Sequence, residues 1–172
     1  MSLSLYACPP ERLPELYALR ATVWLAEGAA PGAFPHGQWS DHHDATRQHW
    51  MVLDEQGMLV AGASLAVHEH LGQIDEPEAY VAYGLKADGV VAAPARVIVH
   101  PAHRGGGIAQ QLLDTQDTAA RKAGATLAVR QASPAMRRLL ERRGWCYHGP
   151  GPADPRFPGT EFSVMSLDLR QP

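Results

Sequence analysis

The 172-residue chain has no long hydrophobic run, only two cysteines and no segment of low complexity. No apolar stretch approaches the roughly 18 residues of a membrane-spanning helix, so we expect no membrane partner. The residues before Cys8 hold neither a basic region nor a long apolar segment, which argues against a secretory signal peptide. Cys8 and Cys146 are therefore expected to be reduced, packed thiols of a cytoplasmic protein.

The bulk composition is that of an ordinary globular protein. Hydrophobic residues make up 45% of the chain and charged residues 19%, which is typical of a folded domain. The length is natural for one domain with a sizeable core. We therefore predict a single domain that covers residues 1–172.

The net charge of −3 conceals an uneven distribution along the chain. Residues 1–95 contain four Lys and Arg against twelve Asp and Glu, whereas residues 96–143 contain nine against three. The basic block suits a ligand with several phosphates, and the acidic part suits a cationic amine. Nucleic acid is not expected as a partner, because the basic block is short and lacks interleaved aromatic residues.

The most informative motif is the glycine run within Arg104–Ala109, which follows the β-branched segment Val97–Val99. A strand, a glycine-rich turn and a helix start in this order can aim several backbone N–H groups at one anion. Glycine allows close approach of the backbone and a positive φ. A nucleotide P-loop is excluded because no Lys-Ser/Thr follows, and the contiguous glycines do not fit a dinucleotide fingerprint. The motif predicts a site for another phosphate carrier.

The order of predicted elements indicates an α/β fold. We expect a strand at 3–8, a helix at 10–27, a hairpin of strands at 50–53 and 59–67, and a strand at 95–100. A helix from about 108 to 123 that ends at Gly124 and a strand at 127–131 follow. The next helix has Ser133 as its cap and Pro134 in its first turn, and strands at 145–148 and 162–169 come last. The segment 72–94 is ambiguous and can hold a short helix near 77–86. With two helices early, the layout predicts a mixed sheet.

The helix predicted at 10–27 rests on the spacing of its residues. Leu13, Leu16, Tyr17, Arg20 and Val23 with Trp24 recur at spacings of three and four, which is typical of one helix face.

The pattern Arg104-x-x-Gly107-x-Ala109 resembles the pyrophosphate loop of the GNAT superfamily of acyl-CoA-dependent N-acyltransferases. The element order is similar to the GNAT fold along essentially the whole chain. The resemblance is strongest to the ElaA-like branch, through Leu19–Trp24, Asp41-x-x-Asp44-x-x-x-x-His49 and Arg96–Val99. It implies a mixed, mostly antiparallel central sheet with helices on both faces.

The resemblance also implies a set of ligand-binding residues. The pyrophosphate of acetyl-CoA would lie on the N–H groups of the loop, and the pantetheine arm would run beside the fourth strand, which is splayed from its neighbour. Ser133 occupies the place of a family asparagine and can offer a hydroxyl. The implied cofactor-binding residues are Val97, Ile98, Val99, Arg104, Gly105, Gly106, Gly107, Ile108, Ala109 and Ser133.

The family's usual acid is missing. Counting back from Gly144, the position of the tyrosine that protonates the departing thiolate holds Leu140. Tyr147 is the candidate to replace it, with strand packing as its alternative role. Glu69, in a His68-Glu69-His70 strand end where it would face away from both histidines, is the candidate base, and His100 is a second contender.

A metal site is not expected. The densest spots, His68-x-His70 and the run Asp41–Asp44, lack the cysteines or the His-Glu-x-x-His arrangement that would support zinc. The arginines at 137, 138, 142 and 143 are expected to form a solvated helix face that can reach phosphates.

Together these features predict transfer of an acetyl or other acyl group from acetyl-CoA to a small-molecule or peptide amine by direct attack in a ternary complex. Two other classes stay open: a non-catalytic acyl-CoA-binding module, and an acyl-homoserine-lactone-synthase-like enzyme, for which Asp41 and Asp44 are the supporting feature. The sequence does not fix the acceptor, the acyl length or whether the protein forms a homodimer.

Overall fold

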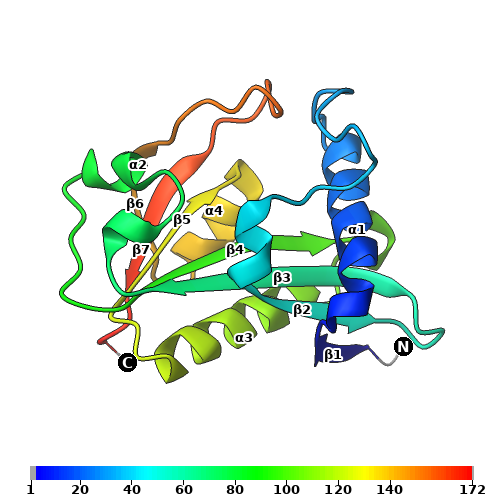
Figure 1. The fold of residues 1–172 in the computed structure, drawn as a ribbon, viewed down its shortest axis with the longest axis horizontal. Helices are drawn as coiled ribbons and strands as arrows, with labels where there is room; N and C mark the ends of the chain where they lie inside the picture. The colour runs from blue at the N-terminus through cyan, green and yellow to red at the C-terminus, as the bar shows by residue number, and fades with distance from the viewer. Residues whose placement is uncertain (1–2, 172) are drawn as a thin grey trace. The chain divides into compact units, whose positions relative to one another are not determined.

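The computed structural model describes residues 3–171. Its seven strands follow the order β1-β2-β3-β4-β5-β7-β6 in one sheet (Figure 1). The ladders in both compact units are antiparallel except for β4 with β5. The expected mixed, mostly antiparallel α/β fold is therefore confirmed.

The chain divides into two compact units, which cover residues 1–65 with 96–116 and residues 66–95 with 117–172. The boundaries fall inside β3 (Leu59–His68), β4 (Val91–Val99) and α3 (Ile108–Lys122), so three elements contribute to both units.

The first unit is built on a three-stranded antiparallel ladder. β1 (Ser4–Ala7) pairs with β2 (Gln48–Leu53), and β2 pairs with β3 across the expected hairpin. A short 3-10 turn, η1 (Pro10–Arg12), leads into α1 (Leu13–Ala26), and η2 (His42–Thr46) precedes β2. Within the described residues α1 is the only α-helix before the hairpin, so the expectation of two early helices is wrong; the other helical segments there are the short 3-10 turns η1 and η2. Residues 28–37, rich in proline and glycine, form a loop, as their composition predicts.

A close contact fixes α1 on this ladder. Leu16, Leu19 and Val23 of α1 form a core cluster with Ile98 of β4. A Cβ at Gly62 of β3 would lie 2.3 Å from Leu16 Cδ1 and 2.9 Å from the Trp50 carbonyl oxygen. Glycine is therefore required at residue 62 for the helix to approach the strand this closely.

The second unit carries the remaining strands. β5 (Leu127–Ala132) pairs antiparallel with β7 (Ser163–Asp168), which pairs with β6 (Cys146–Pro150), so β7 lies between them (Figure 1). η3 (Leu71–Gln73), α2 (Pro77–Val81) and α4 (Pro134–Glu141) complete the unit. Its core cluster joins Leu71, Ile74, Ala79 and Tyr80 to Val91, Val129 and Val164 of the strands.

The strand β4 begins at Val91, earlier than the predicted residue 95. Its pairing with β5 is brief, because only Val91 with Leu127 and Ala92 with Ala128 are in register. Pro94 follows and has no N–H to donate. In the second unit β4 and β5 therefore separate after Ala92. This agrees with the expectation that the fourth strand is splayed from its neighbour.

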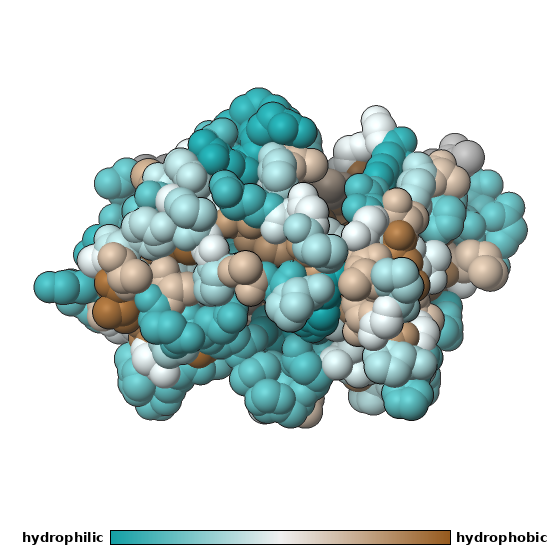
Figure 2. Space-filling model, turned by 90° about the horizontal axis from the view of Figure 1, so that it is seen from above, coloured by the Kyte–Doolittle hydropathy of each residue, from teal (hydrophilic) through white to brown (hydrophobic). Residues whose placement is uncertain are grey.

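The face of the molecule in Figure 2 is mostly hydrophilic. Figure 2 shows hydrophilic residues over most of the face it presents and hydrophobic residues in small, separate patches. The exposed large hydrophobic side chains, such as Tyr6, Met58 and Val81, come from different elements. Within residues 3–171 no helix is both long enough and apolar enough to cross a bilayer.

Candidate functional site

The glycine turn has the open geometry that an anion site needs. β4 ends at Val99, η4 (Pro101–His103) follows, and α3 begins at Ile108. Gly105 and Gly107 have φ values of 87° and 80°, which disfavour any other residue. No atom lies within 4 Å of where a Cβ of Gly105, Gly106 or Gly107 would stand. The space in front of the turn is therefore open.

The backbone N–H groups of this turn are available to a ligand. The first helical hydrogen bond runs from Gln111 N to Gly107 O at 3.0 Å. Among residues 3–171 no carbonyl accepts from the N–H groups of residues 105–110. The first turn of a 15-residue helix adds about half a positive charge at the same point. These donors and the dipole together can hold a phosphate.

The side chains of the predicted cofactor residues divide into two kinds. Ile98 and Ile108 are buried in the core, so they can offer a ligand only their backbone. Val97 and Val99 are half-buried. Arg104 is half-exposed; its Nε donates to the Val99 carbonyl at 3.2 Å and its Nη1 lies 2.6 Å from a carboxylate of Glu27.

The Arg104–Glu27 pair yields a prediction about phosphate affinity. Glu27 holds the guanidinium that the resemblance assigns to the cofactor, and an exposed pair of this kind contributes about 0.2–1 kcal/mol. Glu27→Gln should therefore raise acetyl-CoA affinity up to about fivefold, with the larger gain at low salt. Isothermal titration calorimetry measures this directly, with the distant surface variant Glu55→Gln as control. Weaker binding by Glu27→Gln would mean that Glu27 orients Arg104 instead of competing for it.

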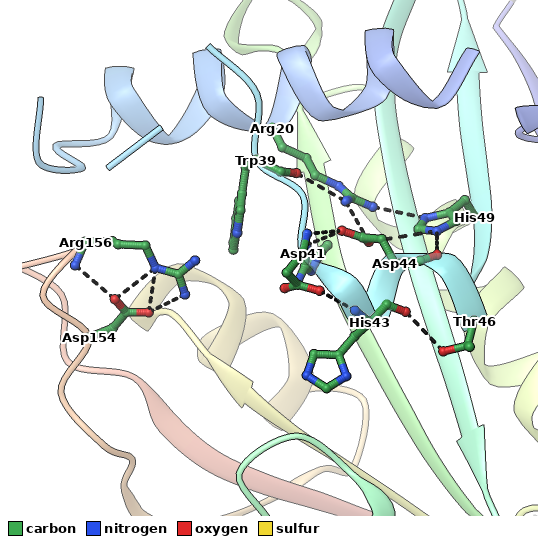
Figure 3. Close-up of polar contacts among 10 residues, drawn as sticks. Arg20, Trp39, Asp41, His43, Asp44, Thr46, His49, Asp154 and Arg156 are labelled. Atoms are coloured by element: carbon green, nitrogen blue, oxygen red, sulfur yellow. Dashed lines mark hydrogen bonds and ion pairs between the residues drawn. The ribbon is translucent and has the colours of Figure 1, made fainter. Parts of the chain in front are cut away.

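Five polar side chains from four segments meet in the first unit. Figure 3 labels four of them, Arg20, Asp41, Asp44 and His49. Arg20 Nη1 donates to Asp44 Oδ1 at 3.0 Å, and Arg20 Nη2 donates to His49 Nδ1 at 3.1 Å. Arg96 Nη1 donates to Asp44 Oδ2 at 3.0 Å, and Arg96 Nη2 donates to Asp41 Oδ2. We call these five residues the buried network.

The buried network is electrically balanced. His49 Nε2 lies 2.9 Å from the Asp44 carbonyl oxygen, so Nε2 carries the proton and Nδ1 accepts from Arg20. Burial lowers the pKa of His49, which keeps the ring neutral. Burial alone would raise the pKa of Asp41, but Arg96 and the His43 N–H outweigh it and lower that pKa. Two guanidinium groups thus face two carboxylates.

The two aspartates do more than neutralise charge. Asp41 caps η2 by accepting from His43 N at 2.9 Å, and Asp44 Oδ2 accepts from Asp41 N at 3.0 Å. This capping box satisfies the first N–H groups of the short helix. The Asp41-x-x-Asp44 spacing of the sequence is therefore the spacing of a cap.

The lowered pKa of His49 predicts a pH-dependent stability. The unfolded chain binds a proton on this residue near its ordinary pKa of 6.5 while the folded chain does not, so stability falls as pH drops below about 6.5 and is unaffected above it. Thermal melts between pH 5 and 7.5 should show this loss. In His49→Gln the slope in this window should disappear. The exposed His70 provides the matched control, His70→Gln, which should keep the slope.

These contacts bear on the predicted acceptor charge. Asp44 is buried and accepts from both guanidinium groups, and both Asp41 oxygens are occupied. Neither carboxylate is left to attract an ammonium group. The acidic residues of the segment 1–95 were expected to suit a cationic amine. Asp41 and Asp44 belong to that segment, but their carboxylates bind groups of the protein itself.

Several arginines of the basic block, residues 96–143, are buried or paired with carboxylates of the protein itself. Arg130 is buried, and burial lowers its pKa to about 10. Arg143 lies 3.0 Å from Asp117, and Arg137 lies 2.9 Å from Glu141. The excess of positive charge in residues 96–143 thus overstates the charge that a phosphate would meet.

The candidate base lies outside regular structure. β3 ends at His68, and Glu69 and His70 form a bend, so the alternation expected for a strand does not apply. Glu69 is exposed, and its backbone N–H donates to Gln73 Oε1 at 2.9 Å. His100 caps η4, where its Nδ1 accepts from Ala102 N at 3.2 Å.

Ser133 and Leu140, which stand at the motif positions of the family, lie at the start of α4 and within α4, and the candidate acid Tyr147 belongs to β6 (Cys146–Pro150). Ser133 is the expected cap of α4, and its Oγ accepts from Met136 N at 3.4 Å. Leu140 is completely buried, so that position contributes only to packing. Tyr147 is 37% exposed, and its ring lies under the guanidinium of Arg137, whose Cζ is 3.4 Å from the ring centroid.

Comparisons with known proteins agree with this geometry. A family model described as the acetyltransferase (GNAT) family matches residues 13–145. No curated protein sequence matches the chain.

Solved structures with the same fold span nearly the whole chain. A GNAT-family acetyltransferase from Staphylococcus aureus Mu50 is 12% identical, with a TM-score of 0.67 and coverage of 98% of this chain and 99% of that one. The yncA protein of Salmonella typhimurium, solved with acetyl-CoA, is 17% identical, with a TM-score of 0.65 and coverage of 98% and 95%. FeeM, an N-acyl amino acid synthase from uncultured soil microbes, is 11% identical, with a TM-score of 0.74 and coverage of 99% and 92%.

Proposed function

The chain belongs to the GNAT acetyltransferase family, and from that premise we propose that it transfers an acetyl group from acetyl-CoA to an amine. The observation that carries the proposal is the open glycine turn at residues 105–107, with free N–H groups at the start of α3. The pyrophosphate lies on the N–H groups of residues 105–109 in this proposal. The pantetheine arm runs along Val97–Val99, and Ser133 adds a hydroxyl.

The proposed chemistry is direct attack in a ternary complex. The amine nitrogen attacks the thioester carbonyl carbon, the carbon–sulfur bond breaks, and coenzyme A leaves as a thiolate that takes up a proton. Backbone N–H groups of the β4 segment 97–99 polarise the carbonyl. The attacking ammonium must first lose a proton, because only the free amine has a lone pair.

Glu69 and Tyr147 are the proposed base and acid. The exposure of both side chains leaves them accessible to solvent and to an acceptor. Glu69→Gln should lower kcat most at low pH, and Tyr147→Phe should lower kcat more than it raises the acceptor KM. Unchanged kcat in both variants would transfer both roles to water.

One experiment tests the proposed function directly. Purified protein is mixed with acetyl-CoA and a panel of small-molecule and peptide amines, free thiol is measured, and the acylated product is identified by mass spectrometry. Thiol release that depends on an amine supports the transferase. Calorimetric binding of acetyl-CoA without any release would favour a binding module.

A second acyl class belongs in the same panel. FeeM is named an N-acyl amino acid synthase, and the acyl-homoserine-lactone-synthase-like alternative also calls for acyl groups other than acetyl in the panel. Octanoyl-CoA and amino acid acceptors therefore accompany acetyl-CoA. We further propose that residues 1–172 act as one catalytic domain in the cytoplasm, where the free Cys8 and Cys146 would stay reduced.

A further inference from the structure

Arg96 has an unusual backbone. Its φ of 57° lies in the left-handed region, where among residues 3–171 the only other residue that is not glycine is Glu76. An arginine in this conformation is strained, and such strain persists only where the surroundings impose it. Arg96 stands one residue before the segment 97–99 that the proposed function places against the acyl thioester.

The Arg96 side chain is held by several partners. One guanidinium nitrogen donates to Asp41 and the other to Asp44, so two carboxylates divide one guanidinium between them. The same guanidinium lies 4.9 Å from the centroid of the Trp39 ring. Only 9% of the side chain is exposed. Direction and depth of the side chain are therefore fixed by three separate partners.

These partners are themselves anchored to α1. Asp44 also accepts from Arg20, a residue of α1 whose side chain is completely buried. Arg20 Nη1 donates to the backbone carbonyl of Trp39 at 3.5 Å. The backbone N–H of Trp39 donates to the Tyr17 carbonyl of α1 at 2.9 Å. Two residues after Arg96, Ile98 packs in the α1 core cluster. The helix thus holds β4 on both sides of Val97.

We propose that Arg96 is a positioning residue, whose clamp by Asp41 and Asp44 sets the direction of the backbone N–H groups at residues 97–99 toward the acyl thioester. This inference rests on the proposed function and assigns the buried network a part in it. None of the five side chains needs to contact a substrate.

The alternative is that the network only stabilises the fold. If β4 needed nothing but a left-handed residue, glycine would serve, as it does at ten other positions with positive φ. Here the chain instead buries a guanidinium and holds it with two carboxylates. A clamp of that kind fixes one backbone direction, whereas glycine would permit several.

Arg96→Gly separates the two roles, because glycine keeps the left-handed conformation and removes the clamp. In the folded variant kcat for the fastest amine of the panel should fall more than tenfold. The Kd for coenzyme A should change less than threefold, because the glycine turn binds it separately. Asp41→Asn, which leaves Asp44 in place, should lower kcat three- to tenfold and provides the test if Arg96→Gly does not fold.

Hydrogen exchange supplies a readout that does not depend on turnover. Deuterium uptake by a peptide containing residues 97–99 should rise in both variants, whereas uptake by a peptide containing residues 105–109 should not. The control is Arg12→Gln, which removes a surface pair with Glu15 in the same unit and should change neither quantity.

Two results would overturn the inference. One is a folded Arg96→Gly protein with kcat within twofold of the wild type and unchanged exchange at residues 97–99. The other is a parallel loss of coenzyme A affinity and kcat, which indicates general structural damage. A wild-type protein that neither binds acetyl-CoA nor releases thiol would instead refute the proposed function itself, and with it the assigned role.

Discussion

Acetyl-CoA affinity is expected to fall at least tenfold when Gly107 is replaced by glutamate. The substitution places a carboxylate in the open space before the turn, where the pyrophosphate is proposed to lie. Each charge-assisted hydrogen bond lost contributes about 1.5–3 kcal/mol, and repulsion between the anions adds to the loss. Calorimetric titration with acetyl-CoA measures the change.

A matched glycine separates this effect from backbone strain. Gly57, in the β2–β3 hairpin, has a φ of 78° and equally open surroundings. Gly57→Glu therefore carries the same conformational cost as Gly107→Glu but places its carboxylate at the hairpin. Its acetyl-CoA affinity should equal that of the wild type. Equal affinity in a folded Gly107→Glu protein would remove the glycine turn from the proposed site.

The largest effect on stability is expected from Asp44→Asn. The neutral amide leaves the guanidinium groups of Arg20 and Arg96 with a single carboxylate, that of Asp41, in a buried place. Loss of one partner from a buried ion pair destabilises a protein by about 3–5 kcal/mol, because the remaining charge is desolvated without compensation. Urea unfolding followed by circular dichroism measures the free energy of unfolding.

The comparison for Asp44→Asn is Asp168→Asn, which removes an exposed pair with Arg170. Water screens that pair, so its loss should leave the unfolding midpoint unchanged. If Asp44→Asn also leaves the midpoint unchanged, Asp41 and water satisfy both arginines. The buried network would then contribute little to the fold.

Local sequence signals predicted most of the elements correctly. Ser133 before Pro134 predicted the start of α4, and Gly124 predicted the end of α3; the structure confirms both, with Ser133 Oγ accepting from Met136 N and Gly124 at a φ of 78°. The glycine turn was equally clear, because its donors and its helix are contiguous in sequence. Signals of this kind depend only on neighbouring residues.

The buried network was not predicted as a set of contacts, although its members appeared in the motifs compared. Arg96 and Asp44 are 52 positions apart, and their contact depends on how η2, α1 and β4 pack. One signal was nevertheless present. Arg20 occupies the otherwise apolar face of the first helix, and a buried guanidinium requires a carboxylate or other acceptor. In the structure that acceptor is Asp44, whose Oδ1 lies 3.0 Å from Arg20 Nη1.

The excess of positive charge counted in residues 96–143 overstated the charge available to a phosphate, also because of tertiary packing. A count along the sequence treats every arginine as exposed, yet Arg20, Arg96 and Arg130 have little contact with solvent. The strand-end prediction for Glu69 failed because β3 gives way to a bend one residue earlier. Burial and strand ends are set by tertiary packing, which a one-dimensional pattern does not contain.

The absence of a side chain at Gly62 has a consequence for how the protein can vary. Because Leu16 and the Trp50 carbonyl oxygen occupy the space of a Cβ there, even an alanine would lift α1 from β3. Arg20 lies one turn after Leu16 on that helix. The hydrogen bond from Arg20 to Asp44, and through Asp44 the contact with Arg96, depend on the distance between α1 and the sheet. A single methyl group at residue 62 would thus disturb the hydrogen bonds of the buried network without touching any of its five side chains. Tolerance to mutation at residue 62 therefore reports on how exactly α1 must be placed.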